Sequence, residues 1–359
     1  MTQPLSTLPA PEVLETPRVL RALISAHRHL AELKGIAGTI PNPDILISTL
    51  SLQEAKDSSE IENIFTTQDE LYQADLFGEQ SRNPAAKEVS RYAAALQSGF
   101  RSVREDGLIT VNRIIDFHTE LMESDAGIRK LPGTVIKNQA TGEVVFTPPQ
   151  DPNEIQALLT DLERFINDEA VYGADQLVKM AIAHHQFESI HPFYDGNGRA
   201  GRILNSLYLV AKGLLDAPVL YLSAYIIETK ADYYRLLQST RDTGEWEPWL
   251  VYLIDGVAQT AKSTTLLIAR MQRLMQDFES RIRETLPKTY SYELLINLFR
   301  HPYTKIEAVQ NDLGVSRLTA SKYLNDLAEA GFLHKRRFGK YNYYINADLV
   351  RLIERSRQL

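Results

Sequence analysis

Residues 191–202, His-Pro-Phe-Tyr-Asp-Gly-Asn-Gly-Arg-Ala-Gly-Arg, constrain the fold of this chain more than any other stretch. Gly196 and Gly198 allow positive φ, so consecutive backbone N–H groups can point together into a concave anion site. The residues from Arg199 to Val210 are good helix formers with apolar residues at helical spacing, so the turn is expected to open a helix. The free N–H groups and the dipole of a helix N-terminus favour a phosphate. The stretch therefore predicts a phosphate site.

The side chains of this stretch predict phosphoryl or nucleotidyl transfer. Arg199 and Arg202 are spaced i, i+3, so both can reach the same polyphosphate. Asp195 can hold Mg²⁺ while the metal keeps waters and phosphate oxygens as its other ligands. His191 can accept the proton of an incoming hydroxyl, because the neutral imidazole is available near neutral pH. No covalent nucleophile accompanies these groups, so catalysis would rest on positioning and charge stabilisation.

Two other interpretations of the same region fail on their context. Residues 196–201 formally match the dinucleotide-binding fingerprint, but that motif needs a strand before it. The preceding residues 175–188 are helical in pattern, so a Rossmann unit is excluded. His184, His185 and His191 lack the His-Glu-x-x-His spacing of a zinc protease, so no transition-metal site is predicted.

The stretch resembles the signature of the Fic (Fido) family, His-Pro-Phe-x-Asp/Glu-Gly-Asn-Gly-Arg-x-x-Arg, at every fixed position. The resemblance implies a mostly α fold, with a Fic-type helical core, a β-hairpin flap and a small C-terminal winged helix-turn-helix domain. It also implies a protein adenylyltransferase, which moves AMP from ATP to a Tyr, Thr or Ser hydroxyl of a protein with Mg²⁺ and releases pyrophosphate. In this resemblance His191 is catalytic, Asp195 binds the metal, and the nucleotide is bound by Gly196, Asn197, Gly198, Arg199 and Arg202.

A second motif lies upstream, in a helix expected at about 44–65. Ser58 and Glu62 are i, i+4 neighbours there, so the hydroxyl can orient the carboxylate. The run Ser58-x-x-x-Glu62-Asn63 resembles the Fic inhibitory motif, in which the glutamate pairs with the second arginine of the signature. Applied to this chain, the resemblance places Glu62 opposite Arg202. A γ-phosphate of ATP must then either displace the glutamate or be misaligned by it. The alternative is a solvated surface glutamate.

Residues 134–149 contain two β-rich runs around a glycine turn, which predict a hairpin. On the residues alone this is a surface hairpin, whereas the resemblance makes it the flap that holds a target segment by strand addition. The resemblance also places residues around Tyr233 and Arg241 beside the adenine, although aromatic residues at helical spacing are usually core. It leaves self-modification, a homodimer and removal of AMP by the same site open.

Residues 285–359 differ in character from the rest of the chain. Residues 306–324 have the layout of a helix-turn-helix, and residues 334–344 form a basic run expected to be a hairpin, so the unit resembles a winged helix. Such units bind DNA through phosphate-contacting cations, and they also dock proteins, so both kinds of partner stay open. The cations that would contact phosphate are Arg317, Lys322, Lys335, Arg336, Arg337 and Lys340.

A chain of 359 residues is long for one core, so several domains are expected. An arm over 1–17 is expected to precede a first helix that ends near Gly35. The expected units are an N-terminal helical region (1–105), the Fic catalytic domain (106–255), a connecting helix (256–284) and the winged helix-turn-helix domain (285–359).

Composition narrows the function classes further. The absence of cysteine removes disulfides and thiolate catalysis and fits a reducing cytoplasm. The net charge of -7 argues against nucleic-acid binding by the whole surface, though not against a local basic patch. No apolar run is long enough to span a bilayer and no basic leader opens the chain, so a cytoplasmic protein without a membrane partner is expected.

One competing function is a DNA-binding transcriptional regulator with a vestigial or sensory nucleotide site. The intact signature weighs against it, because an inactive site would tolerate loss of His191 or Asp195. The other is a de-AMPylase, in which Glu62 would assist the attack of water.

Overall fold

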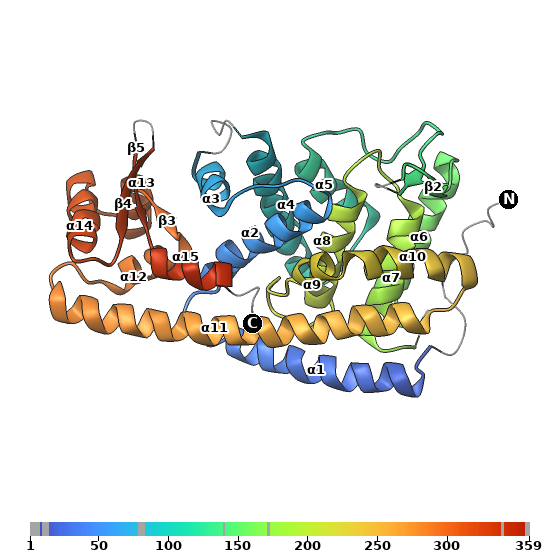
Figure 1. Cartoon of the computed structure of the whole chain (residues 1–359), viewed down its shortest axis with the longest axis horizontal. Coiled ribbons are helices and arrows are strands. Elements are labelled where there is room, and N and C mark those ends of the chain that lie inside the picture. Colours follow the sequence, from blue (N-terminus) through green and yellow to red (C-terminus); the bar gives the residue numbers. More distant parts are fainter. Residues whose placement is uncertain are drawn as a thin grey trace.

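The computed structural model is mostly helical, with two small antiparallel sheets (Figure 1), and confirms the expected fold class. Most of the expected N-terminal arm, the hairpin residues Gln139 and Ala140, and the cation Lys340 lie outside the described residues. The structure describes Leu8 and residues 14–77, 83–138, 141–170, 173–338 and 341–355.

Two long helices form one side of the molecule. Helix α1 (Pro17–Ala37) packs along α11 (Glu247–Thr285), which runs along the bottom of Figure 1. The expected end of the first helix near Gly35 is wrong, because α1 continues to Ala37. A glycine costs a helix about 1 kcal/mol relative to alanine, and the apolar stripe that α1 buries against α11 outweighs that cost. Helix α11 contains the expected connecting helix and begins well before it.

The next three helices carry the upstream motif. They are α2 (Pro43–Ile61), α3 (Gln68–Phe77) and α4 (Pro84–Asp106). Each of α2 and α4 begins with proline after an asparagine whose side chain accepts a backbone N–H, the arrangement that proline at N1 favours. Helix α2 is buried on nearly all sides, and it packs against α4 and α9 (Leu222–Glu228). It is therefore a core helix, and its polar residues must find partners inside the protein.

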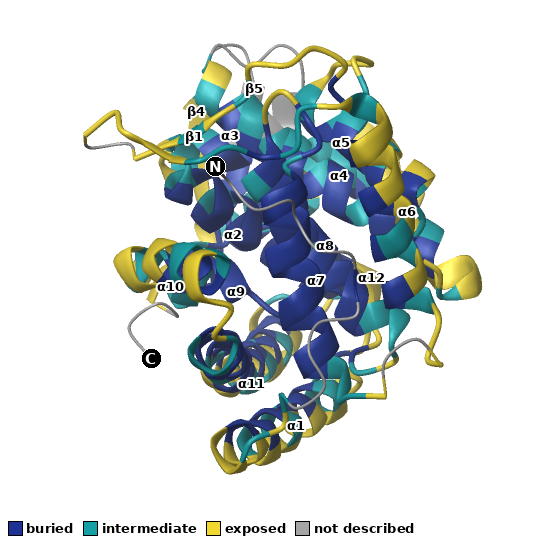
Figure 2. Ribbon diagram, turned by 90° about the vertical axis from the view of Figure 1, so that its right-hand side faces the viewer, coloured by how far each residue is buried: buried dark blue, intermediate teal, exposed yellow. Residues whose placement is uncertain are grey.

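The centre of the molecule is a helical core around α7 and α8. Every residue of α7 from Leu177 to Ile190 is buried, and Figure 2 shows α7 and α8 as the buried middle of the fold. The hairpin expected within 134–149 is present, with Ile136 opposite Phe146 in antiparallel register. The elements of this core are α5 (Val111–Met122), β1 (Ile136–Lys137), β2 (Val144–Phe146), α6 (Pro152–Asn167), α7 (Gln176–Ile190), α8 (Asn197–Ala211), α9 and α10 (Lys230–Thr243).

The C-terminal elements form a separate sheet with helices around it, at the red end of Figure 1. Gly314, at φ 64°, makes the turn between α13 and α14, and Ser316 caps α14 by accepting the N–H of Thr319. The expected helix, glycine turn and second helix are thus present, followed by a hairpin in a sheet of order β3-β5-β4. The elements are α12 (Tyr292–Arg300), β3 (Tyr303–Thr304), α13 (Ile306–Leu313), α14 (Arg317–Glu329), β4 (His334–Phe338), β5 (Tyr341–Ile345) and α15 (Ala347–Glu354).

The C-terminal unit is docked on the segment that follows the upstream motif. Tyr303 of β3 stacks on Tyr72 of α3, with ring centroids 4.8 Å apart and planes 18° from parallel. The hydroxyl of Tyr303 donates to Asp69, and Arg336 of β4 forms an ion pair with the same carboxylate at 3.1 Å. Aromatic stacking with a partly buried hydrogen bond gives this contact a fixed geometry.

Candidate active site

The signature forms the connection between α7 and α8. Asn197 holds this loop closed, because its side chain accepts the N–H of Phe193 at 2.9 Å and donates to the carbonyl of the same residue at 2.8 Å. Gly196 takes φ 76° at the start of α8, where a Cβ would lie 2.6 Å from the sulfur of Met122. Among the described residues, no side chain caps this helix end. The first N–H groups of α8 are therefore available to an anion.

His191 follows α7 in a left-handed backbone conformation, with φ 49°. Burial lowers the pKa of its imidazole to about 4, and the guanidinium groups of Arg241 and Arg129 act in the same direction. The ring is therefore neutral near pH 7, the form in which a histidine accepts a proton.

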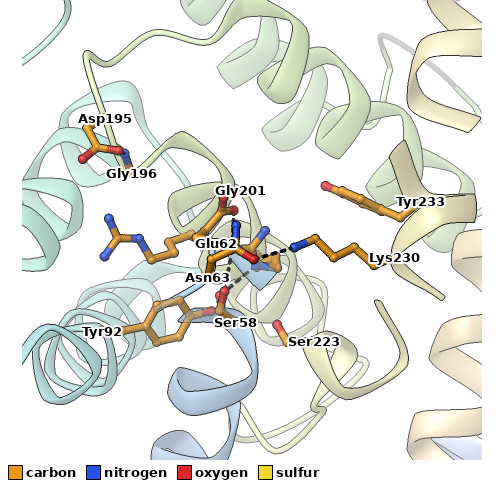
Figure 3. Close-up of polar contacts among 12 residues, drawn as sticks. Ser58, Glu62, Asn63, Tyr92, Asp195, Gly196, Gly201, Ser223, Lys230 and Tyr233 are labelled. Carbon is orange, nitrogen blue, oxygen red and sulfur yellow. Dashed lines mark hydrogen bonds and ion pairs between the residues drawn. The ribbon is translucent and has the colours of Figure 1, made fainter. Parts of the chain in front are cut away.

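Asp195 lies at the exposed edge of the same loop. One carboxylate oxygen accepts the N–H of Gly196 at 2.7 Å, which orients the side chain at the mouth of the anion site. An exposed carboxylate beside a phosphate cradle fits Mg²⁺, which prefers oxygen ligands and keeps several waters. Figure 3 shows Asp195 and Gly196 together, on the side of the site away from Tyr233.

The loop is supported by His118, which lies off the signature in the sequence and was expected to be structural. His118 of α5 lies against Asp195, with its Nε2 2.9 Å from the backbone carbonyl oxygen. Its ring stacks on Phe193, with centroids 3.5 Å apart and planes within 7°. His118 is distant from the signature in sequence, so only the packing of α5 against α8 brings it here.

Each signature arginine meets a carboxylate from an N-terminal helix. Arg199 is buried and forms an ion pair with Glu88 of α4, a partner that no motif indicates. Arg202 is also buried and forms an ion pair with Glu62 at 2.9 Å. Buried guanidinium groups need such partners, because an unpaired charge inside the protein is costly.

Ser58 and Glu62 both bind the guanidinium of Arg202. Arg202 Nε donates to the Ser58 hydroxyl at 2.7 Å, and Nη2 donates to the Ser58 carbonyl at 2.9 Å. The serine was expected to act by orienting the glutamate, whereas in the structure it contacts the arginine directly. Helix α2 ends at Ile61, so Glu62 occupies the C-cap. A Cβ at Gly198 would collide with the Glu62 carboxylate, which therefore lies against the first turn of α8.

Glu54 anchors α2 one turn before Ser58. Its carboxyl group accepts hydrogen bonds from the Tyr92 hydroxyl at 3.1 Å and the Ser223 N–H at 3.2 Å, and it also contacts the Ser223 hydroxyl. Burial raises the pKa of Glu54 to about 7, against the lowering effect of these hydrogen bonds. Glu54 and Ser58 are four residues apart within α2, so they lie on the same face of the helix, and Glu62 follows at its C-cap.

Beyond α2, Asn63 takes a left-handed conformation with φ 62°. Lys230, at the start of α10, donates to its side-chain oxygen at 3.3 Å, as the dashed line in Figure 3 shows. Two cations thus hold the chain where α2 ends: Arg202 binds Glu62, and Lys230 binds Asn63.

Tyr233 and Arg241 were expected to border the adenine. Tyr233 is buried, and its hydroxyl lies 2.8 Å from His184 Nε2 in the core behind α8. Arg241 donates to Ser189 Oγ at 2.9 Å, and its guanidinium lies 4.4 Å from the ring centroid of Phe146 in the hairpin. These contacts leave the adenine assignment a prediction, and they add a contact between Arg241 and the flap.

Strand β2 of the hairpin presents apolar side chains to solvent. Val144 and Val145 are 54% and 39% exposed. Two flap-side N–H groups, of Lys130 and Leu131, donate to the hydroxyl of Tyr194 at 2.9 and 3.1 Å. Tyr194 stands in the signature, so the segment that leads into the flap and the catalytic loop are joined by direct hydrogen bonds.

The C-terminal cations do not all face the same way. Arg317 and Lys322 are exposed on α14, the second helix of the helix-turn-helix. Lys335 donates to Asn325 at 2.8 Å, and Arg336 is paired with Asp69 of α3.

Two features can be reported only for the part of the chain that the structure describes. No group of three or more His, Cys, Asp or Glu side chains is arranged there to hold a metal ion. Within the same residues, no helix has the length and apolar character needed to cross a bilayer.

Three family models match the chain in succession. They are the Fic/DOC family N-terminal model over residues 20–101, the Fic/DOC family model over 108–209, and the model of the C-terminal domain of SoFic-like protein adenylyltransferases over 274–349. Curated relatives include the protein adenylyltransferase fic-1 of Caenorhabditis elegans, 26% identical over an alignment 183 positions long that covers 43% of this chain and 35% of the relative. Another is the protein adenylyltransferase Fic of Drosophila simulans, 29% identical over 152 residues, which are 42% of this chain and 29% of the relative. The chain spans about a third of the length of these relatives.

Solved structures of Fic proteins share the fold. A Fic family protein from Desulfovibrio desulfuricans is 20% identical and superposes with a TM-score of 0.57, covering 96% of this chain and 98% of that one. A Fic domain containing signaling protein from Bacteroides thetaiotaomicron is 21% identical with a TM-score of 0.55, covering 67% of this chain and 95% of that one. With the signature in place between α7 and α8, the Fic/DOC family models over residues 20–101 and 108–209 confirm the resemblance seen in the sequence: the chain belongs to the Fic/DOC family.

Proposed function

We propose that this protein is a protein adenylyltransferase, which transfers AMP from ATP to a hydroxyl side chain of a protein. The observation that carries the proposal is the neutral, half-buried His191 beside an uncapped helix N-terminus that can hold a phosphate chain. The relatives named as protein adenylyltransferases support the choice of AMP as the transferred group.

The reaction would proceed by direct displacement. His191 accepts the proton of the target hydroxyl, whose oxygen attacks the α-phosphorus of ATP. The bond from this phosphorus to the bridging oxygen breaks, and pyrophosphate leaves. The N–H groups after Gly196 hold the phosphate chain, with Arg199 and Arg202 beside it. Asp195 would hold Mg²⁺, which neutralises negative charge on phosphate oxygens when bound.

Glu62 is proposed to inhibit this transfer within the same chain. Its carboxylate occupies Arg202 and lies against Gly198, where the γ-phosphate would otherwise find the arginine. ATP could still enter, but its α-phosphorus would be displaced from the line of attack. Removal of AMP by the same site, with Glu62 assisting water, is the alternative that shares these residues.

The target segment is proposed to add to the hairpin as a strand. Val144 and Val145 leave an apolar, exposed edge at β2, which suits backbone pairing with an extended segment. Hydroxyls of this chain itself are further acceptors, so self-modification is expected where a suitable loop reaches the site.

The C-terminal unit is proposed to be a winged helix that binds duplex DNA. The exposed cations of α14 and β4 support this partner, since phosphate contacts position such domains. Docking of a protein is the alternative, and the salt dependence described in the Discussion separates the two.

The proposed activity is tested by incubating the protein and its Glu62→Gly variant with Mg²⁺ and ATP labelled at the α-phosphate. Label retained on protein after denaturing electrophoresis is the expected result. Release of labelled AMP without label on protein would point to hydrolysis. An absence of turnover in both proteins would support a regulator with a vestigial nucleotide site.

A further inference from the structure

Arg129 is a buried cation that the proposed chemistry does not use. It lies between α5 and the flap and is only 1% exposed. Among the described residues, no carboxylate lies within ion-pair distance of its guanidinium. A buried charge without a counter-ion must be compensated by other polar groups.

Those groups are backbone carbonyls from two distant segments. Nε donates to the carbonyl of His191 at 2.8 Å, and Nη2 donates to that of Ile190 at 3.3 Å and to that of Pro149. The backbone N–H of Arg129 also donates to the carbonyl of Pro192 at 2.9 Å. The last carbonyls of a helix have no partner within it, so the arginine satisfies the end of α7.

The contact reaches the end of the flap. Arg129 lies in the segment that leads into residues 134–149, and Pro149 closes them. One side chain therefore joins the segment before the flap, the end of the flap and the catalytic histidine. His191 has a left-handed backbone, which is uncommon for a residue with a side chain, and a donor on its own carbonyl holds that conformation.

We infer that Arg129 is a positioning residue, which holds the His191 backbone and the end of the flap as one unit so that the bound target hydroxyl meets the imidazole. The inference rests on the proposed adenylyl transfer. It assigns Arg129 two separable contributions, the geometry of its forked hydrogen bonds and the charge that it places near His191.

The charge contribution predicts a change in the pH profile. The charged groups facing His191 are Arg241 of α10, Arg129, and Glu62 after α2. Burial is the main cause of the low pKa of His191, and the two arginines lower it further. Removing the Arg129 charge should therefore raise this pKa. The base is active only when neutral, so the acidic limb of the rate profile should move to higher pH.

The experiment compares Arg129→Met, Arg129→Lys and Lys130→Met, each in the Glu62→Gly background, by initial rates of AMP transfer between pH 4 and pH 8. Arg129→Met should move the acidic limb upward by roughly one pH unit and lower turnover by roughly 10²-fold. Arg129→Lys keeps the positive charge but loses the planar guanidinium and its several hydrogen bonds. Turnover should therefore fall, while the acidic limb of the pH–rate profile stays at the parent's pH. KM for ATP should stay within a few-fold in both.

Lys130→Met is the matched control, because it removes a neighbouring exposed cation that does not contact His191. This variant should change neither the position of the acidic limb of the pH–rate profile nor the turnover. Far-ultraviolet circular dichroism establishes whether each variant is folded. The inference is overturned if a folded Arg129→Met variant keeps the acidic limb of the pH–rate profile where the parent has it. It is also overturned if Arg129→Lys turns over at the parent's rate. If Arg129→Met does not fold, the turnover of Arg129→Lys alone decides whether the inference holds. An inactive Glu62→Gly parent contradicts the proposed function itself and not the role of Arg129.

Discussion

Glu62 and Arg202 are 140 positions apart in the sequence, yet a carboxylate oxygen of Glu62 accepts a hydrogen bond from Arg202 Nη2 at 2.9 Å. The arginine is wholly buried and the glutamate is partly exposed, so the pair is open from the side of the glutamate. An anion that approaches Arg202 must compete with this carboxylate. The pair therefore links the N-terminal helices to the start of α8, where we place the nucleotide.

His191→Ala should remove AMP transfer and leave ATP binding within a few-fold, because the imidazole serves as base and not as a phosphate ligand. Loss of a general base typically costs about 10²–10⁴ in rate. Transfer of labelled AMP and equilibrium binding of ATP would be measured on the same preparation, in the Glu62→Gly background. Transfer near the parent's rate would remove His191 from the catalytic role.

Glu54 should make stability fall as pH rises. Its pKa is about 7 in the folded protein against an ordinary value near 4.5, so the folded state holds a proton that the unfolded state has lost. The stability contribution is complete below about pH 4.5 and is lost as pH rises through about 7. Glu54→Gln should remove this dependence, on the order of 1–3 kcal/mol between pH 5 and pH 8.

The measurement is urea unfolding of wild type and Glu54→Gln at both pH values. The difference between the two proteins isolates Glu54, because the buried His184 and His185, whose pKa values are about 3, act in the opposite direction in both. Glu105→Gln, at an exposed position on α4, is the control. Parallel pH dependences of wild type and Glu54→Gln would show that the Glu54 carboxyl ionises normally in the fold.

DNA binding by the C-terminal unit should depend steeply on salt. Each phosphate contact contributes roughly 0.9 log units of affinity per tenfold change in salt. Arg317→Ala should reduce the slope by about one contact. Arg336→Ala should reduce it less, because Arg336 is already paired with Asp69. Gel shifts or fluorescence anisotropy at several salt concentrations would measure both. Absence of binding to any duplex at low salt would favour the protein-docking alternative.

The parts of the site that could be predicted from the sequence are those whose chemistry is local. The run from His191 to Arg202 contains its own turn, helix start and charges, so its form follows from neighbouring residues. The helix, glycine turn and helix around Gly314 could be predicted for the same reason.

The groups that could not be predicted come from other helices. Glu88, His118 and Arg129 contact the signature only because α4, α5 and the flap pack against it, and no spacing in the sequence encodes that approach. The role of Ser58 was misjudged for a related reason. The i, i+4 rule applies inside a helix, and α2 ends before Glu62. The end of α1 was misplaced because packing against α11 outweighs the low helix propensity of glycine.

The most direct test of the whole account is the initial rate of AMP transfer from labelled ATP by wild type, Glu62→Gly, and Glu62→Gly combined with Arg202→Ala. A phosphate misplaced by about 1 Å can cost on the order of 10² in rate, so Glu62→Gly should raise transfer at least about tenfold, mainly in turnover. The double variant should show no such gain, because the arginine that the first substitution frees is gone. Equal rates for wild type and Glu62→Gly would contradict the account, and the pair of Glu62 with Arg202 would then have a structural role alone.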